Sequence, residues 1–278
     1  MADVRACLRG FAAKRVSTDQ VMRVLMSHDE WLAPVALFAG TGLERGKGAE
    51  HIEVPGGEVI LFSQEYGAPA GVLALFSDRE AAERASAAGA ALGPYASKVP
   101  AAAIFAAIPD RFQSIKINDL GPLDEFWFIG KDAFPLTGLW VEAIAVERAL
   151  AGPASARTGA VAERIARFPH YLICVTGEHH ALVGLPDFLG HRAAAVVMTA
   201  PDCRDAFRAA LPSVLLAGMQ NAWGDGSSIF AYAAMDSSFD AVAFNPAGPT
   251  GPITFARDEV VALVNAFPTG RIDLKLST

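Results

Sequence analysis

Hydrophobic residues recur at two different spacings along this chain, and the change from one spacing to the other predicts helices that lead into strands. The clearest helical run is Val21, Val24, Leu25 and His28. Ser17 and Gln20 stand before it at the spacing of a capping box, so the helix is expected to begin there. The apolar segment that opens at Trp31 then predicts a strand.

The same order of patterns occurs twice. The matched pairs of segments are Val21 to Val35 with Val161 to Val175, Leu75 to Ala82 with Val197 to Arg204, and Phe112 to Asp119 with Phe239 to Pro246. Internal similarity of this kind is typical of chains built from repeated supersecondary units. The sequence therefore predicts two tandem pseudo-repeats.

Each unit contains a buried strand that ends at a hydroxyl residue and turns into a helix. Ser77 is followed three positions later by Glu80, and Thr199 is followed by Asp202. This spacing predicts that each hydroxyl caps the helix that follows. A strand that switches into a capped helix indicates an α/β fold.

A second matched position is the asparagine that ends an alternating strand in each unit. Asn118 is followed by Asp119, whereas Asn245 is followed by Pro246. Asparagine tolerates turn conformations and can bond its own backbone, so both residues are predicted to form turns.

The two units differ in two places. The first contains the extra stretch Gly40 to Gly57, in which Pro55-Gly56-Gly57 predicts the turn of a hairpin. After Lys131-Asp132, Pro135 and Gly138 are expected to interrupt the helix that is continuous in the second unit. A separate helix is therefore expected from about Leu139 to Leu150.

The short, small and polar stretch Ala151 to Gly159 is the best candidate for a boundary. The prediction is an α/β protein of mixed sheets with flanking helices, whose two units, residues 1–150 and 151–278, pack together. The tail, Arg271 to Thr278, alternates apolar and charged residues, which predicts a short final strand at a sheet edge.

Composition narrows the class of protein. Of the 278 residues, 52% are hydrophobic and 19% are charged, which is typical of a chain with a buried core. The net charge of −7 and the lack of a basic cluster argue against nucleic acid as a partner. No apolar run is long enough for a membrane span, no export signal is visible at the start, and Cys7, Cys174 and Cys203 are far apart. We expect a cytoplasmic protein that does not contact a membrane.

No catalytic or cofactor motif fits. The glycine-rich stretch Gly40 to Gly48 lacks both the spacing of a phosphate-binding P-loop and that of a dinucleotide fingerprint. His179-His180 lacks a chelating spacing, and Ser227-Ser228 lacks the nucleophile-elbow pattern. Cys174 and Cys203 are expected to pack in the core. The sequence predicts no cofactor, no metal and no catalytic residue, and it favours a protein that is not an enzyme.

Phe126-Trp127-Phe128 is the most aromatic segment of the chain. In a strand, Trp127 would face one way while Phe126 and Phe128 face the other. Such a strand is either covered on both faces or offers an aromatic anchor to a partner, since aromatic residues are enriched in interface hot spots. Exposed tryptophans at Trp127 or elsewhere would favour the second alternative.

These patterns resemble the SseB-like family of bacterial proteins, named for an enhanced serine sensitivity phenotype. The resemblance is carried by the helix leading into Trp31-Leu32-Ala33-Pro34-Val35, by the strand and helix of Leu73 to Ala85 and Ala195 to Ala209, and by the Asn-Pro turn within Ala241 to Phe267. It implies an intracellular α/β protein without an established reaction. The first unit departs from the Asn-Pro pattern, since Asn118 is followed by Asp119.

The sequence therefore predicts a non-catalytic binding or regulatory protein whose partner is another protein or a second copy of itself. The candidate binding residues are Trp127, Asn118, Asn245 and Pro246. The alternative is a small-molecule-binding protein or an enzyme with its site in a cleft between the two units, where duplicated domains often bind ligands.

Overall fold

The chain forms α-helices and mixed β-sheets, which confirms the α/β fold. The computed structural model describes residues 3–37, 49–54, 57–62, 71–87, 95–106, 108, 110, 112–177, 181–216 and 218–276. Contacts divide the chain into unit 1, Met1–Val141, and unit 2, Glu142–Thr278. The division falls inside helix α5 (Phe134–Ala151) and not in the polar stretch that follows it. That the units pack together stays a prediction.

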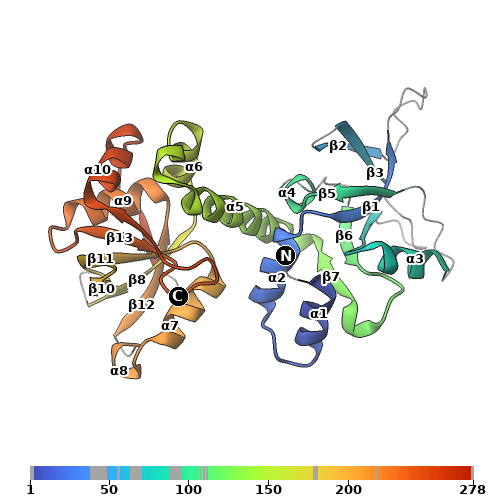
Figure 1. Cartoon of the computed structure of the whole chain (residues 1–278), viewed down its shortest axis with the longest axis horizontal. Coiled ribbons are helices and arrows are strands. Elements are labelled where there is room, and N and C mark those ends of the chain that lie inside the picture. Colours follow the sequence, from blue (N-terminus) through green and yellow to red (C-terminus); the bar gives the residue numbers. More distant parts are fainter. Residues whose placement is uncertain are drawn as a thin grey trace. The chain divides into compact units, whose positions relative to one another are not determined.

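Unit 1 combines two groups of strands with helices (Figure 1). Its helices before α5 are α1 (Val4–Ala12), α2 (Thr18–Ser27), α3 (Arg79–Ala87), α4 (Ala101–Phe105) and the short 3-10 helix η1 (Leu123–Glu125). Its strands are β1 (Trp31–Leu37), β2 (Ala49–Val54), β3 (Gly57–Phe62), β4 (Gly71–Leu75), β5 (Tyr95–Val99), β6 (Phe112–Ile117) and β7 (Trp127–Gly130).

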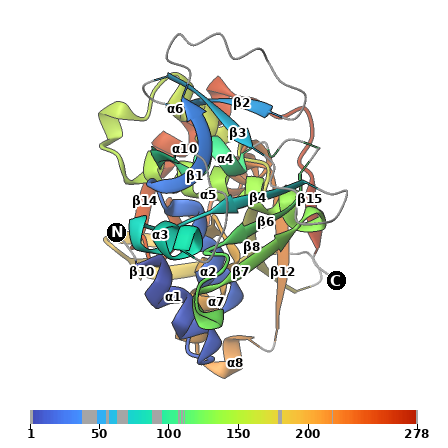
Figure 2. The same cartoon turned by 90° about the vertical axis from the view of Figure 1, so that its right-hand side faces the viewer.

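The strands of unit 1 are hydrogen-bonded in the orders β2-β3-β1-β5 and β4-β6-β7. β4 and β6 are parallel, β7 is antiparallel to β6, and the three run side by side in Figure 2. An isolated antiparallel bridge between Leu32 and Phe76 joins the two groups. The alanines of α3 pack on Ala74 and Phe76, so this helix covers one face of the sheet.

Several local predictions for unit 1 are confirmed. α2 begins after Ser17, whose side chain accepts the Gln20 N–H while the Gln20 side chain accepts the Ser17 N–H. β2 and β3 form the predicted antiparallel hairpin, in which Val54 lies opposite Gly57.

Gly40 to Gly48, which did not fit a P-loop, lie outside the described residues.

The predicted break before Leu139 is wrong. α5 is continuous from Phe134 to Ala151, and the 3-10 turn η2 (Lys131–Ala133) precedes it. Pro135 lies in the first turn of α5, where the amide N–H that proline lacks has no intrahelical acceptor to lose. Gly138 lies within the helix, where a glycine costs only about 1 kcal/mol relative to alanine. Neither residue therefore stops the helix.

Unit 2 is built around one larger mixed sheet. Its helices after α5 are α6 (Ala160–Arg167), α7 (Pro201–Ala210), α8 (Ser213–Leu216), α9 (Gly226–Met235) and α10 (Arg257–Ala266), with the 3-10 turn η3 (Ala154–Ala156) before α6. Its strands are β8 (Tyr171–Thr176), β9 (Ala181–Leu182), β10 (Gly184–Phe188), β11 (His191–Met198), β12 (Met219–Gly224), β13 (Ala241–Phe244), β14 (Ile253–Ala256) and β15 (Leu274–Leu276).

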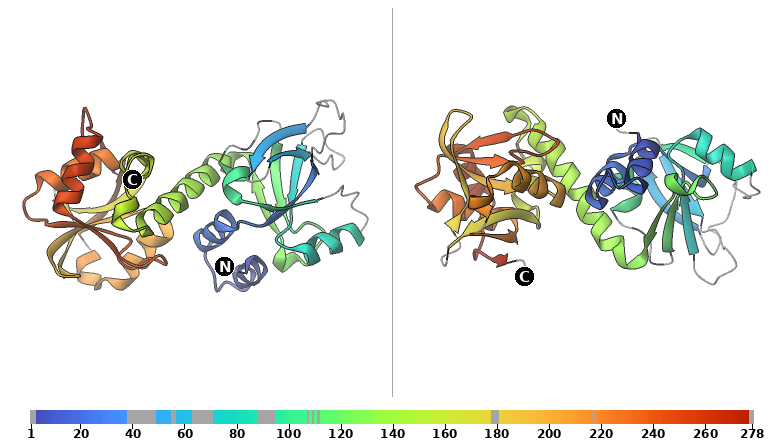
Figure 3. Two further views of the ribbon diagram at one scale, coloured as in Figure 1. Left: turned by 45° about the horizontal axis from the view of Figure 1, so that its top comes forward. Right: turned by 90° about the horizontal axis from the view of Figure 1, so that it is seen from below.

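The sheet of unit 2 has the order β14-β13-β11-β8-β12-β15. Figure 3 shows α10 and α7 on opposite sides of this sheet. The core under α6, α9 and α10 is aromatic, and Tyr171, Phe230 and Phe244 contact one another at ring-centroid distances of 5.6 to 5.9 Å. β15 pairs with β12 at the edge of the sheet, which confirms the predicted final strand.

No helix within the described residues combines the length and the apolar character that a membrane span requires.

Candidate functional site

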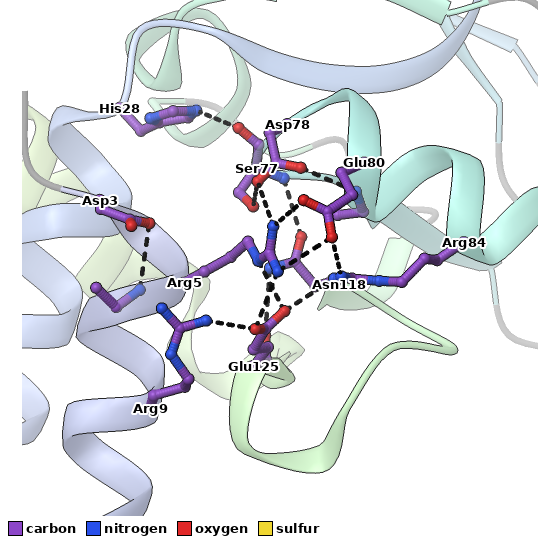
Figure 4. Close-up of polar contacts among 12 residues, drawn as sticks. Asp3, Arg5, Arg9, His28, Ser77, Asp78, Glu80, Arg84, Asn118 and Glu125 are labelled. Carbon is purple, nitrogen blue, oxygen red and sulfur yellow. Dashed lines mark hydrogen bonds and ion pairs between the residues drawn. The ribbon is translucent and has the colours of Figure 1, made fainter.

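The carboxyl ends of the parallel strands β4 and β6 hold the first cluster of polar side chains (Figure 4). Asn118 follows β6 with a φ of 53° and is 1% exposed. Its Oδ1 accepts the Ser77 N–H at 2.9 Å, and its Nδ2 donates to the Glu125 carbonyl at 3.2 Å. The Gly121 N–H donates to the Asn118 carbonyl at 3.2 Å, so the predicted turn is confirmed. Asn118 thus ties three segments of unit 1 together.

The prediction that Ser77 caps α3 is wrong. Asp78 takes this role, because its Oδ1 accepts the Ala81 N–H at 2.9 Å while the Ser77 hydroxyl donates to its Oδ2 at 3.0 Å. A carboxylate is the stronger acceptor at a helix N-terminus, where it also faces the positive end of the helix dipole. The serine therefore stabilises the capping carboxylate of Asp78 through its hydroxyl.

Glu125, in η1, is buried at the centre of an arginine cluster. Its carboxylate accepts hydrogen bonds from Arg5 Nε at 2.8 Å, Arg9 Nη1 at 2.5 Å and Arg84 Nη2 at 2.8 Å. Arg5 and Arg84 also contact the exposed Glu80 at 2.8 Å each. Figure 4 shows these side chains converging from α1, α3 and η1. The cluster therefore fastens the N-terminal helix to the end of the sheet.

Glu125 and Arg5 stabilise each other in the charged form. Burial alone would raise the pKa of Glu125, but hydrogen bonds from Arg5 and Arg9 and the nearby charge of Arg84 outweigh it, so the pKa lies below its ordinary value. Hydrogen bonds to Glu80 and Glu125 raise the pKa of Arg5. At neutral pH Glu125 is an acceptor of structural hydrogen bonds and has no proton to donate as an acid.

His28 is the buried histidine beside this cluster. It is 7% exposed, its Nε2 lies 3.1 Å from the Ser77 carbonyl oxygen, and its ring meets Trp31 edge to face at 4.7 Å. Burial lowers the pKa of His28 below its ordinary value, and the bond to the Ser77 carbonyl offsets only part of this effect. The folded state therefore favours the neutral imidazole.

We expect acid to destabilise unit 1 through His28. Because the folded pKa is lower, the unfolded chain binds more protons between that pKa and about 6.5, so the free energy of unfolding falls as pH drops through this window. Glutamine is neutral and its Nε2 can donate to the Ser77 carbonyl. The difference in stability between His28→Gln and the wild type should therefore shift in favour of the variant from pH 7 to pH 5, measured by urea unfolding. A pH-independent difference would contradict this assignment.

The corresponding cluster of unit 2 lies where β11 and β13 end. Asn245 has a φ of 48°, is fully buried, and accepts the Thr199 N–H on its Oδ1 at 3.0 Å. Its Nδ2 donates to the Thr199 hydroxyl at 2.9 Å and to the Thr250 hydroxyl at 3.2 Å. The Gly248 N–H donates to its carbonyl at 2.9 Å, and the half-buried Pro246 lies within this turn. The predicted turn at Asn245 is confirmed.

Thr199 does not cap α7, contrary to the prediction. The residue before α7 is Ala200, which makes no side-chain capping bond, and Pro201 occupies the first turn. The Thr199 hydroxyl donates instead to the carboxylate of Glu147, a residue of α5 that is 3% exposed. The fold offers this buried acceptor, so the hydroxyl turns away from the helix amides.

The other residues that the sequence offered as candidates are buried or hydrogen-bonded to the backbone where the structure describes them. Cys174 and Cys203 are fully buried, and burial raises the pKa of the Cys174 thiol, which keeps it protonated. The Ser227 hydroxyl donates to the Ala166 carbonyl at 3.1 Å. His179-His180 lie outside the described residues, and within those residues no group of histidine, cysteine and carboxylate side chains could hold a metal ion.

The aromatic segment is arranged differently from the prediction. β7 begins at Trp127, so Phe126 lies outside the strand. Trp127 is half-buried and packs against Phe11 of α1, with 4.8 Å between the two ring centroids. Phe128, in contrast, is 54% exposed. Of the other tryptophans, Trp31 and Trp140 are buried, and the half-buried Trp223 lies under the Lys275 ammonium at 4.5 Å. The aromatic side chain that this segment offers to solvent is therefore Phe128.

Sequence reasoning missed most of the residues that make the two polar clusters, namely Arg5, Arg9, Arg84 and Glu147, and it interpreted Glu125 only as an acid near the start of a helix or strand. Arg5 and Glu125 are 120 positions apart, and no periodicity or spacing links them. Glu147 lies in a helix whose other residues are mostly apolar. An acidic residue among apolar helix positions was the one local signal available.

Comparisons with known proteins found no match: no family model fits the chain, and no significant similarity was found to the curated proteins or to the solved structures.

Proposed function

We propose that this chain is a non-catalytic binding protein of two SseB-like units that recognises another protein through unit 1. The observation that carries the proposal is a run of exposed apolar side chains between β6 and the end of the sheet. Leu120, Leu123 and Phe128 are 47%, 90% and 54% exposed. Apolar side chains clustered in one short segment are typical of protein contact sites.

The place of this segment in the sheet supports a protein partner. β7 comes last in the order β4-β6-β7, and among the described strands it pairs with β6 alone. An edge strand offers backbone donors and acceptors to an incoming strand, and an adjacent aromatic side chain adds specificity. Phe128 is such a side chain, whereas the predicted anchor Trp127 is engaged with Phe11.

The duplication remains part of the proposal, and the strand relations support it. In unit 2, β14-β13-β11-β8-β12 are neighbours; in unit 1, β7-β6-β4 are joined through the bridge at Leu32 to β1 and β5. In both units one parallel pair, β4 with β6 or β11 with β13, ends at an asparagine with positive φ. That asparagine accepts the N–H of Ser77 or Thr199.

The chemistry of the matched positions supports a binding role over catalysis. Asn118, Asn245, Ser77 and Thr199 use their side chains to hold backbone amides, buried side chains or a helix cap. Side chains engaged in this way specify the fold, which accords with a scaffold that presents a surface.

The experiment compares the full chain with the double variant Leu123→Ser and Phe128→Ser as bait in extracts of the source cells. We expect the wild type to capture a protein at near-stoichiometric amounts, and the variant to lose at least about tenfold in affinity, as hot-spot truncations do. Sedimentation velocity of the purified chain tests whether a second copy is the partner.

The matched control is Leu189→Ser with Met235→Ser in unit 2. These side chains are 60% and 75% exposed, so the substitutions remove similar apolar surface elsewhere. The control should capture the same protein as the wild type, and circular dichroism should show that both variants are folded. Equal capture by the unit 1 variant, or a monomer that captures nothing specific, would refute the proposal.

A further inference from the structure

Unit 2 contains a pocket of about 350 Å³ between η3, α6, β14 and α10. Its apolar walls are formed by Ala162 and Ile165 of α6, Phe255 of β14, and Ala262, Leu263 and Ala266 of α10. Small residues face each other across the gap, so the two helices leave space that larger side chains would fill. This volume lies within the range of natural small-molecule sites, which are mostly apolar with few polar groups.

The polar side of the pocket is formed by Arg157, which follows η3. Its guanidinium carbon lies 4.5 Å from the centre of the Phe255 ring, and its Nη2 donates to the Leu150 carbonyl at 2.8 Å. Its side chain is 16% exposed, and its buried Nε has no hydrogen-bond partner among the residues that the structure describes. The stack on Phe255 and the bond to Leu150 hold the cation in place at the pocket wall.

Glu259 also lines the pocket, but it engages Arg157 only loosely. Its Oε2 accepts the Ala256 N–H at 2.9 Å at the start of α10, and its Oε1 lies 3.6 Å from Arg157 Nη1, beyond hydrogen-bond reach. The first turn of α6, behind Gly159 and without a side-chain cap, borders the same space. The Arg157 guanidinium and the positive end of the α6 dipole therefore border this space together with the Glu259 carboxylate.

We propose that this pocket binds a small amphipathic monocarboxylate. The apolar chain or ring of the ligand lies between α6 and α10, and its carboxylate takes the hydrogen bonds that Arg157 Nη1 does not make to Glu259. An Arg guanidinium pairs with a carboxylate in planar geometry, and an apolar wall makes that charge-assisted bond stronger than it is in water. This site lies in unit 2 and is independent of the protein contact proposed for unit 1.

The test uses octanoate as the probe and octanol and octylammonium as its neutral and cationic counterparts, titrated into the full chain at pH 7 by calorimetry. Octanoate should bind most tightly of the three. Glu259→Gln keeps an oxygen for the Ala256 N–H and removes the negative charge, so it should tighten octanoate by about threefold to tenfold and leave octanol unchanged. Arg157→Met should weaken octanoate by about tenfold or more.

Because Arg157→Met also removes the bond to Leu150, a second pair of variants tests the pocket itself. Ala262→Phe fills the space from an exposed position of α10 and should abolish binding of octanoate and octanol alike. Val261→Phe, at the neighbouring exposed position that does not line the pocket, should bind as the wild type does. The proposal is overturned by octanoate that does not bind at millimolar concentration, by octylammonium that binds more tightly, or by Glu259→Gln that leaves octanoate unchanged.

Discussion

Replacing Glu125 with glutamine is expected to lower the free energy of unfolding of unit 1 by about 2 to 3 kcal/mol. Glutamine keeps the volume but removes the charge that Arg5, Arg9 and Arg84 share. Removing one charge of a buried ion pair leaves the opposite charges without a partner, which is why the loss of stability is large. The arginine side chains are 19%, 42% and 29% exposed, so solvent screens part of the effect and the expected loss is smaller than the roughly 3 to 5 kcal/mol of a fully buried pair.

Urea unfolding followed by circular dichroism measures this change, and the transition that shifts should be that of unit 1. Glu80→Gln is the matched control, since Glu80 bonds two of the same arginines but its side chain is 66% exposed. We expect the control to cost less than about 1 kcal/mol. Equal losses in the two variants would show that burial of Glu125 contributes nothing beyond a surface ion pair.

Replacing Asn245 with alanine is expected to destabilise unit 2 by about 3 kcal/mol. The buried Thr199 N–H loses its acceptor, which costs about 1 to 3 kcal/mol. Alanine at a φ of 48° adds about 1 kcal/mol of backbone strain, which asparagine tolerates better. The loss is measured by urea unfolding of the full chain, in the transition of unit 2.

Asn245→Gly separates these two contributions. Glycine adopts the left-handed conformation without strain but supplies no acceptor, so it should recover about 1 kcal/mol of the alanine loss and no more. A glycine variant as stable as the wild type would mean that the side-chain hydrogen bonds of Asn245 contribute nothing. A glycine variant no better than alanine would mean that the turn imposes no strain.

The outcome of the capping predictions shows where local reasoning fails. Ser17 and Gln20 form the predicted capping box, because both partners lie within one turn of chain. Ser77 and Thr199 had the same local signature, yet their hydroxyls donate to the carboxylates of Asp78 and Glu147. Whether a hydroxyl caps its own helix depends on which acceptor the fold brings near it.

The sequence by itself determined the elements whose causes are local: the helix that ends before Trp31, the hairpin around residues 55–56, and the asparagine turns after β6 and β13. Only the tertiary structure decided that Arg5 pairs with Glu125, that Phe128 rather than Trp127 faces solvent, and that α6 and α10 leave a pocket at Arg157. The reason is physical. Hydrophobic period and turn chemistry act over a few residues, whereas ion pairs, exposure and cavities depend on which distant segments the folded chain brings together.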